Sequence, residues 1–320
     1  MLNIYRNKKH HSWKKFLLFI PLVALLSAGV TYWAVKHFVL EPVASETVDI
    51  AEETAEEAVP ESEREPVKMP ENAVAIDDDF SGLQLEDCQK PVFDRYTLAE
   101  RQAKGLPTAM PALTPYANGK VAYLTFDDGP DDKNTPAILD ILANYGVKAT
   151  FFVTGTMCET NPEVLKRIFA EGHAIGNHSY SHNYNKLYAS KESFLAEITK
   201  TDEVIHKILG VRPVIIRAPG GTVGMFTDDY WPMLKENGYA EYDWNVSTED
   251  ATPEHPSPER ELEHVDLQTR GALKDGAAIV LMHSIGGKEN TVSALPSIIM
   301  LLQEKGYSFG VVTPMTPQPW

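Results

Sequence analysis

Cysteine is scarce in this sequence. The 320 residues contain only two, Cys88 and Cys158. Neither has the spacing of a metal site, so we exclude a cysteine-ligated metal centre. The two thiols either stay reduced or form a single disulfide, and the choice depends on the compartment in which the chain folds.

Acidic residues are absent from residues 1–15, and charged residues of either sign are absent from residues 16–35. Twenty uncharged, mostly apolar residues form a helix about 30 Å long, which is enough to cross a bilayer. The five Lys and Arg of residues 1–15 predict a cytoplasmic tail, which places everything after residue 40 outside the cell. We interpret residues 16–38 as an uncleaved signal anchor in the cell membrane, because the apolar run exceeds the ~7–15 residues of a signal-peptide core. A cleaved signal, which would make the protein secreted, is the alternative.

Basic residues are rare in residues 41–80, which hold fourteen Asp or Glu against Arg64 and Lys68. Such a segment is too charged and too poor in large apolar residues to build a core. We therefore predict an acidic, disordered tether over residues 39–87, followed by a segment, residues 88–118, that leads into the domain. Much of the net charge of −16 belongs to this tether and says little about the substrate.

The two cysteines lie on either side of the start of the expected domain. Because the chain is predicted to be exported, we expect a disulfide between Cys88 and Cys158 that clamps the preceding segment onto the domain. Two reduced thiols remain the alternative.

From about residue 119, seven strand-like runs alternate with six helix-like stretches, which predicts parallel βα units. In about 200 residues this pattern fits either an open doubly wound sheet or a short (β/α) barrel. The strands are expected at 121–126, 149–155, 173–178, 214–219, 239–246, 277–283 and 307–312, and the helices near 134–145, 161–171, 190–209, 227–237, 258–274 and 292–304.

Reactive side chains stand at or after the carboxyl ends of most expected strands. Such side chains converge only if the strand ends form a ring, which favours the barrel; an open sheet would gather them at one switch point. They are Asp127, Asp128, His178, Arg217, Trp244, Asp250 and His283.

Two short motifs indicate chemistry. In TFDDGP, residues 125–130, two acids follow an apolar run, although Asp-Gly is also a common turn signal. In HSYSH, residues 178–182, two imidazoles four residues apart would lie on one face of a helical turn and could bind one metal ion. With a neighbouring acid they form a His, His, Asp site. Non-haem iron oxygenases use a similar ligand set, but that interpretation gives Asp127, Arg217 and His283 no shared task.

Five motifs in this order, TFDDGP, HSYSH, RAPGG (217–221), DWNVSTED (243–250) and IVLMH (279–283), resemble those of the NodB homology domain, the polysaccharide deacetylases of carbohydrate esterase family 4. The resemblance covers roughly residues 119–315. It implies an α/β fold, a distorted (β/α)₇ barrel of parallel strands, over residues 119–320.

The resemblance also implies a metal centre. Asp128, His178 and His182 would hold one divalent ion, usually zinc, with cobalt and manganese as alternatives. Asp127 would be the general base that takes a proton from the metal-bound water, and Arg217 would pair with Asp127 and orient it.

A second group of implied roles concerns the leaving group and the substrate. His283 would protonate the departing amine, and Asp250 would keep His283 protonated. The backbone N–H of Gly220 would help to hold the oxyanion, while Trp244 and Leu281 would wall a pocket for the acetyl methyl group.

Three positions depart from the family's common pattern. Gly220 stands where an aromatic residue is frequent, Asn183 where proline is frequent, and Ala251 where tryptophan is frequent. None of the three is a ligand or a proton carrier. We expect the walls of the sugar cleft to differ from the commonest version.

The sequence therefore predicts a metal-dependent hydrolase that removes N-acetyl groups from a polysaccharide. Because the anchor and tether would hold the domain just outside the membrane, N-acetylglucosamine of peptidoglycan is the expected substrate. Chitin-like or exported polysaccharides and N-acetylmuramic acid are alternatives, and a non-catalytic glycan-binding wall module is the non-enzymatic one. We expect the membrane and a polysaccharide as partners, and no nucleic acid.

Overall fold

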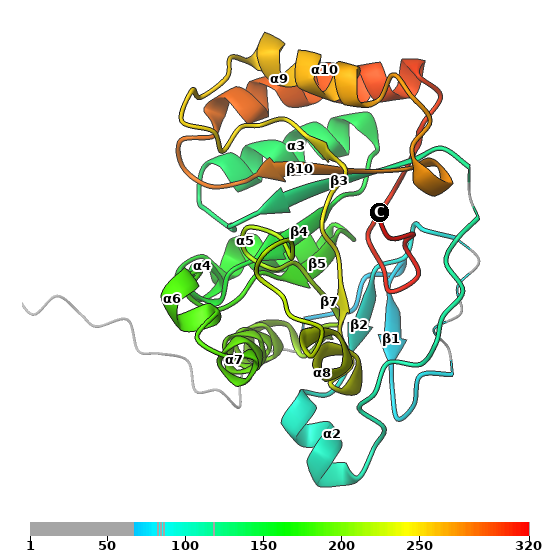
Figure 1. The fold of residues 1–320 in the computed structure, drawn as a ribbon, viewed down its shortest axis with the longest axis vertical. Coiled ribbons are helices and arrows are strands. Elements are labelled where there is room, and N and C mark those ends of the chain that lie inside the picture. The colour runs from blue at the N-terminus through cyan, green and yellow to red at the C-terminus, as the bar shows by residue number, and fades with distance from the viewer. Residues whose placement is uncertain (1–66, 82, 84, 86, 118, 320) are drawn as a thin grey trace, which may run out of the picture. The chain divides into compact units, whose positions relative to one another are not determined.

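The computed structural model describes residues 67–81, 83, 85, 87–117 and 119–319 (Figure 1). The expected cytoplasmic tail, the signal anchor and residues 39–66 of the tether lie outside these residues. Among the residues described, no helix has both the length and the apolar character needed to cross a bilayer.

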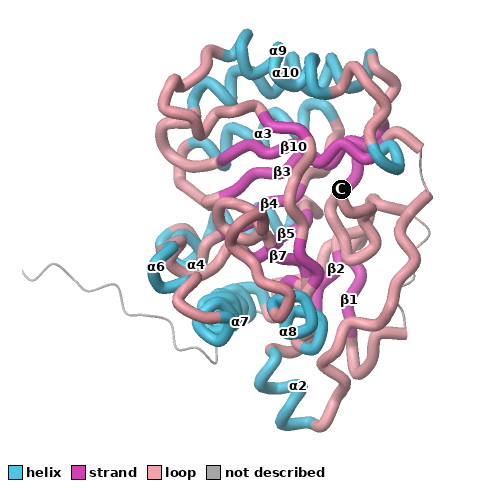
Figure 2. Tube along the Cα trace, viewed as in Figure 1, coloured by secondary structure: helices cyan, strands magenta, loops and turns pink. Residues whose placement is uncertain are grey.

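The main sheet is a curled half-barrel of parallel strands, consistent with the expected barrel. Its strands follow the order β8-β7-β5-β4-β3-β10-β9, and β11 pairs with β3 beside them. Figure 2 shows the central part of this order, from β7 to β10. The strands are β3 (Val121–Asp127), β4 (Thr150–Val153), β5 (Ala174–Asn177), β7 (Ile215–Ile216), β8 (Ala240–Glu241), β9 (Val246–Ser247), β10 (Ala277–His283) and β11 (Ser308–Gly310).

The predicted strand at residues 239–246 is two short strands on opposite edges of this sheet. β8 pairs with β7 at one edge, and β9 pairs with β10 at the other. Only residues 242–245 connect them, and an extended chain covers at most about 3.6 Å per residue. The two edges must therefore lie close together, so the sheet curls and cannot remain an open doubly wound sheet.

The distortion of the barrel is visible at β3, where two strands share one edge. Its first residues, Val121 to Tyr123, pair with β11, and Thr125 to Asp127 pair with β4. The seventh predicted strand is thus only partly inserted into the sheet.

The side chains of β3 and β10 alternate between two hydrophobic clusters, as a period of two requires. Val121 and Tyr123 point into the barrel with Ala277 and Ile279 of β10. The residues between them point outward against the helices and join the largest cluster of the described chain, which explains why both strands are apolar until near their carboxyl ends. The inward column of β3 continues as Thr125 and Asp127, so the apolar interior becomes polar at the carboxyl end of the strand.

Helices cover the outer face of the sheet, and α9 and α10 lie side by side beyond β10 (Figure 1). Most begin and end near the predicted positions; α7 is capped by Ser190, whose side chain accepts from the Ser193 amide, and it ends at Gly210 in the left-handed conformation. The helices are α2 (Leu98–Lys104), α3 (Asn134–Tyr145), α4 (Gly155–Thr160), α5 (Pro162–Ala170), α6 (Tyr184–Leu187), α7 (Lys191–Leu209), α8 (Tyr230–Glu236), α9 (Pro258–Gln268) and α10 (Glu289–Glu304), with a 3₁₀ turn at Lys274–Gly276.

The predicted tether is wrong from residue 67 to residue 87, because the described residues of this stretch belong to the folded domain. β1 (Val74–Ile76) pairs with β2 (Val92–Asp94), which pairs with β6 (Arg212–Pro213). Ile76 and Leu83 are buried with Val92 in a hydrophobic cluster of their own. The high acid count of residues 41–80 concealed the uncharged stretch 72–76, which contains the first strand.

The expected disulfide is also wrong, since the structure has both cysteines as buried thiols. Cys88 lies inside the barrel cluster, against Gly310 of β11, whereas Cys158 on α4 lies in the cluster between sheet and helices. The N-terminal segment is held by strand pairing and apolar burial instead of a covalent link.

Candidate metal and catalytic centre

The register of the parallel strands brings the predicted site residues to one edge of the sheet. Asp127, the last residue of β3, stands opposite His283, the last residue of β10. Asn177 of β5 stands opposite Ile216 of β7, so the residues that follow them, His178 and Arg217, emerge side by side. This edge is the carboxyl end of the barrel, where the apolar interior stops.

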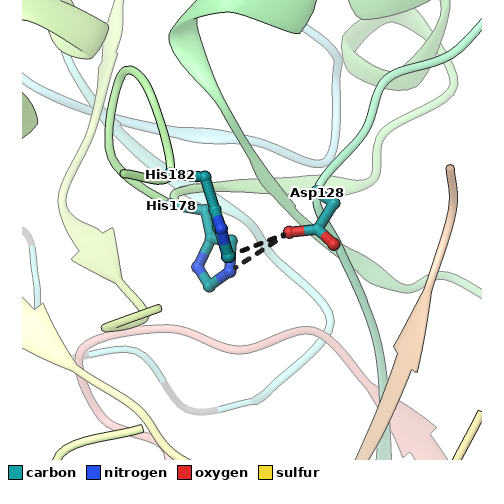
Figure 3. A group of neighbouring side chains, drawn as sticks. All are labelled: Asp128, His178 and His182. Atoms are coloured by element: carbon teal, nitrogen blue, oxygen red, sulfur yellow. Dashed lines mark ion pairs between the residues drawn. The ribbon is translucent and has the colours of Figure 1, made fainter. Parts of the chain in front are cut away.

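Asp128, His178 and His182 converge on one point. One ligand atom from each lies within 4.8 Å of the others. The Nε2 atoms of His178 and His182 lie 3.5 and 3.3 Å from the same oxygen, Asp128 Oδ1, as Figure 3 shows. The predicted set of three potential ligands is therefore assembled in the fold.

The HSYSH segment is not the helical turn that the sequence predicted. It is a loop in which Ser179 and His182 adopt left-handed backbone angles, with φ of 69° and 51°. The side chain of Asn177 accepts a hydrogen bond from the Ser179 amide at 2.9 Å, and Ser179 Oγ accepts one from the His182 amide at 3.1 Å. These local bonds replace helical ones and turn both imidazoles toward Asp128.

These residues fit a divalent metal ion. Asp128 Oδ1 is buried and forms no hydrogen bond within the described residues, although two imidazoles face it. His178 Nδ1–H donates to the Arg217 carbonyl at 2.8 Å, which leaves the lone pair of Nε2 directed at the site. Burial lowers the pKa of His178 to about 3, so this imidazole is neutral and able to ligate. A buried carboxylate oxygen that faces two imidazole nitrogens is the arrangement that a cation would satisfy.

Asp127 has a different partner. Its Oδ1 accepts a hydrogen bond from Arg217 Nη1 at 2.8 Å, as the resemblance predicted, and its Oδ2 lies 3.8 Å from His178 Nε2. Burial raises the pKa of Asp127, and the nearby charge of Arg217 opposes that rise. The carboxylate is thus fixed at one oxygen while the other faces the site.

Arg217 is fully buried and all of its hydrogen bonds help to fix its position. Nη1 also donates to Thr125 Oγ1 at 2.6 Å, Nε to the Tyr242 carbonyl at 2.8 Å, and Nη2 to the Asp243 carbonyl at 3.1 Å. Because its carbonyl also accepts from His178, this residue positions both the candidate base and one candidate ligand.

His283 and Asp250 form the predicted pair. His283 Nδ1–H donates to Asp250 Oδ1 at 2.8 Å, and the His283 amide donates to Oδ2 at 2.9 Å. Burial alone would lower the pKa of His283, but the hydrogen bond and charge of Asp250, with the charges of Asp127 and Asp128, outweigh it and raise that pKa. Nε2 is left for the reaction centre.

The three predicted substrate-pocket residues are close to this centre but less tightly defined. Gly220 has a φ of 78°, in a turn where the Gly221 amide donates to Ala218. Trp244 lies between β8 and β9, within 5.7 Å of the Arg217 guanidinium, and Leu281 is a nearly buried residue of β10. Their roles as oxyanion donor and acetyl pocket stay predictions.

Several polar residues that support the site were missed by the sequence analysis. Thr125 lies inside the TFDDGP motif and could have been found there, because it shares the inward face of β3 with Asp127. Thr291 and Glu261 stand far away in sequence, yet Thr291 Oγ1 lies 3.0 Å from Asp250 Oδ2 and 3.3 Å from Glu261 Oε1. No spacing pattern identifies these two.

Comparisons with known proteins find similar chains both by sequence and by structure. A family model described as polysaccharide deacetylase matches residues 115–242. A peptidoglycan-N-acetylglucosamine deacetylase of Bacillus cereus is 36% identical over 199 residues, which cover 61% of this chain and 67% of the relative. A peptidoglycan-N-acetylmuramic acid deacetylase of Bacillus subtilis is 35% identical over 196 residues, 61% of this chain and 38% of the relative. The solved structure of a Streptococcus mutans CE4 esterase is 32% identical with a TM-score of 0.59, covering 67% of this chain and 95% of that one.

Proposed function

Because the chain belongs to the polysaccharide deacetylase family, the hydrolases of carbohydrate esterase family 4, we propose that it removes N-acetyl groups from N-acetylglucosamine in peptidoglycan with the help of a bound divalent metal. One observation carries the proposal. The adjacent acids have separate partners, Asp127 the buried Arg217 and Asp128 the two histidines. A turn that served only the fold would require neither set of partners.

Asp128, His178 and His182 would hold the metal, with zinc as the first candidate and cobalt or manganese as alternatives. When bound, a divalent ion in such a site lowers the pKa of water and polarises a carbonyl oxygen, which is the chemistry that amide hydrolysis needs. Three protein ligands leave positions open for water and substrate.

Asp127 would act as the general base. Its Oδ2 is free of Arg217 and lies on the side of the ligand histidines, where a nucleophilic water would be deprotonated. A carboxylate pKa raised by burial brings this base closer to the operating pH.

His283 would act as the general acid that protonates the departing amine. Asp250 binds Nδ1–H, so Nε2–H of the imidazolium is the proton available to the leaving nitrogen. The raised pKa of His283 favours the imidazolium, the form that a general acid needs.

The relatives' names support peptidoglycan as the polymer, but they divide over the sugar. The Bacillus cereus relative is named for N-acetylglucosamine and the Bacillus subtilis relative for N-acetylmuramic acid, at nearly equal identity. We favour N-acetylglucosamine, with residues 16–38 anchoring the enzyme in the cell membrane and the catalytic domain outside. Cleavage of that segment would make the enzyme secreted.

Acetate release from purified peptidoglycan tests this function. The full-length chain in detergent should release acetate, a chelator should stop the release, and added zinc should restore it. Mass spectrometry of glycan fragments should locate the free amine on glucosamine. Free amines on muramic acid would show that N-acetylmuramic acid is the substrate sugar. No acetate release from peptidoglycan or chito-oligosaccharides with any of the three metals would refute the proposed enzymatic activity.

A further inference from the structure

Gly220, one of the three departures from the family's pattern, lies beneath the side chain of Tyr184. A Cβ atom added at Gly220 would stand only 2.6 Å from the Tyr184 hydroxyl oxygen and 3.1 Å from its ring. The positive φ of Gly220 also disfavours any side chain there. Tyr184, which follows the HSYSH motif, therefore occupies the space next to residue 220.

Local structure holds Tyr184 in this place. Asn183 caps α6, its Oδ1 accepting from the Lys186 amide at 3.2 Å, and Tyr184 is the first residue of that short helix. At the other end of α6, the Tyr188 hydroxyl donates to the Pro219 carbonyl at 2.6 Å. This bond ties α6 to the turn that contains Gly220.

The ring of Tyr184 borders the metal site. Its centroid lies 5.5 Å from that of His182 and 5.9 Å from that of Tyr188, so it is supported on two sides. The side chain is nevertheless 42% exposed. The Tyr184 ring is thus a large aromatic surface that lies beside the candidate metal ligand His182 and is open to solvent. Such a surface is available for contact with a substrate.

The Tyr184 hydroxyl is available as a donor. None of the hydrogen bonds of the described residues involves it, whereas the Tyr188 hydroxyl donates to the Pro219 carbonyl.

We propose that Tyr184 is a specificity-determining residue of the sugar cleft. Its ring packs against the N-acetylated pyranose, and its hydroxyl donates to an oxygen of that sugar above Gly220. The ligand class is an N-acetylhexosamine within a polymer, whose rings offer apolar C–H faces and hydroxyl acceptors. This inference rests on the proposed function, which it deepens by assigning recognition to a residue outside the metal and proton-transfer groups.

Tyr184→Phe keeps the ring and removes only the donor. We expect kcat/KM for acetate release from chito-oligosaccharides to fall about tenfold, mainly through KM, because one hydrogen bond to the substrate is lost. Tyr184→Ala should lose more, since the ring contact disappears too. Tyr145→Phe is the matched control. Tyr145 is the last residue of α3 and lies at the amino ends of the strands, away from the site, so this variant should leave kcat and KM unchanged.

Binding measured by calorimetry separates this inference from the proposed activity. In an Asp127→Asn background, which should bind without turnover, the Kd for a chito-oligosaccharide should rise about tenfold on adding Tyr184→Phe. Unchanged Kd and kcat/KM in Tyr184→Phe would overturn the inference even if the enzyme is active. A Tyr184-dependent Kd in a chain that releases no acetate would instead leave the inference standing and remove the proposed reaction.

Discussion

Asp127 and Asp128 are neighbours in sequence, but their surroundings make them chemically different. Asp127 ends a strand and is buried against Arg217, whereas Asp128 has a φ of 74° and turns its side chain away toward the histidines. In an ordinary extended strand, the side chains of two adjacent residues point to opposite faces, so only one would reach the barrel interior. The left-handed backbone of Asp128 allows both carboxylates to lie near His178 while each keeps its own partner.

Substituting each acid by asparagine should separate the two roles. Asp127→Asn keeps an acceptor for Arg217 but removes the base, so kcat should fall at least about 100-fold with zinc affinity nearly unchanged. Asp128→Asn removes a charged ligand, so zinc affinity should fall by more than about tenfold. Calorimetric titration of zinc and acetate release measure the two effects. Equal loss of zinc affinity in both variants would contradict the assignment.

At the scale of elements, α9 and α10 meet at a buried carboxyl group behind the catalytic pair. Glu261 of α9 is almost fully buried, and its Oε1 lies 3.3 Å from Thr291 Oγ1 of α10, which also bonds Asp250. Burial, and then the charge of Asp250, raises the pKa of Glu261 to about 8. The protonated carboxyl is the form that this helix contact accommodates.

This contact predicts a pH-dependent stability. A carboxyl with a pKa near 8 when folded and 4.5 when unfolded stabilises the fold fully below about pH 4.5 and loses that contribution as pH rises toward 8. Glu261→Gln mimics the protonated form, so its free energy of unfolding relative to wild type should increase from pH 5 to pH 8. Urea unfolding at both pH values measures the difference. The exposed Glu263→Gln on the same helix is the control, and an equal pH dependence in Glu261→Gln and wild type would refute the prediction.

At the scale of the whole molecule, the sequence was informative wherever one local pattern determined the outcome. Alternating apolar runs predicted most strands, and a parallel topology brings their carboxyl ends together, so Asp127, Arg217 and His283 meet as expected. Local patterns do not predict the structure where contacts between distant residues determine it. The HSYSH loop follows bonds from Asn177 and Ser179, and residues 239–246 divide between two edges because each end finds a different strand.

The attachment of the N-terminal segment to the domain could not be predicted from the sequence. It depends on buried charged residues, and these cannot be told from solvent-exposed ones in the sequence alone. Arg101 of α2 forms a two-point contact with Asp94 of β2, at 2.6 and 2.9 Å, and both side chains are fully buried. Arg212 of β6 bonds the same carboxylate at 3.0 Å. The Arg212 bond joins this segment to the catalytic domain across 118 residues of sequence. Arg101 holds the segment itself together, because it also donates to the carbonyls of Asp77 and Pro107.

Arg101→Met should therefore destabilise the whole domain. It leaves Asp94 buried with Arg212 as its one cationic partner among the described residues, and removing one member of a buried ion pair costs about 3–5 kcal/mol. Arg95→Met is the matched control, because Arg95 pairs with Asp77 on the surface and such a pair contributes at most about 1 kcal/mol. Urea unfolding gives both values. If residues 67–117 were a loosely attached leader, Arg101→Met would cost no more than Arg95→Met, and limited proteolysis would remove the segment from the wild-type chain without loss of the remaining fold.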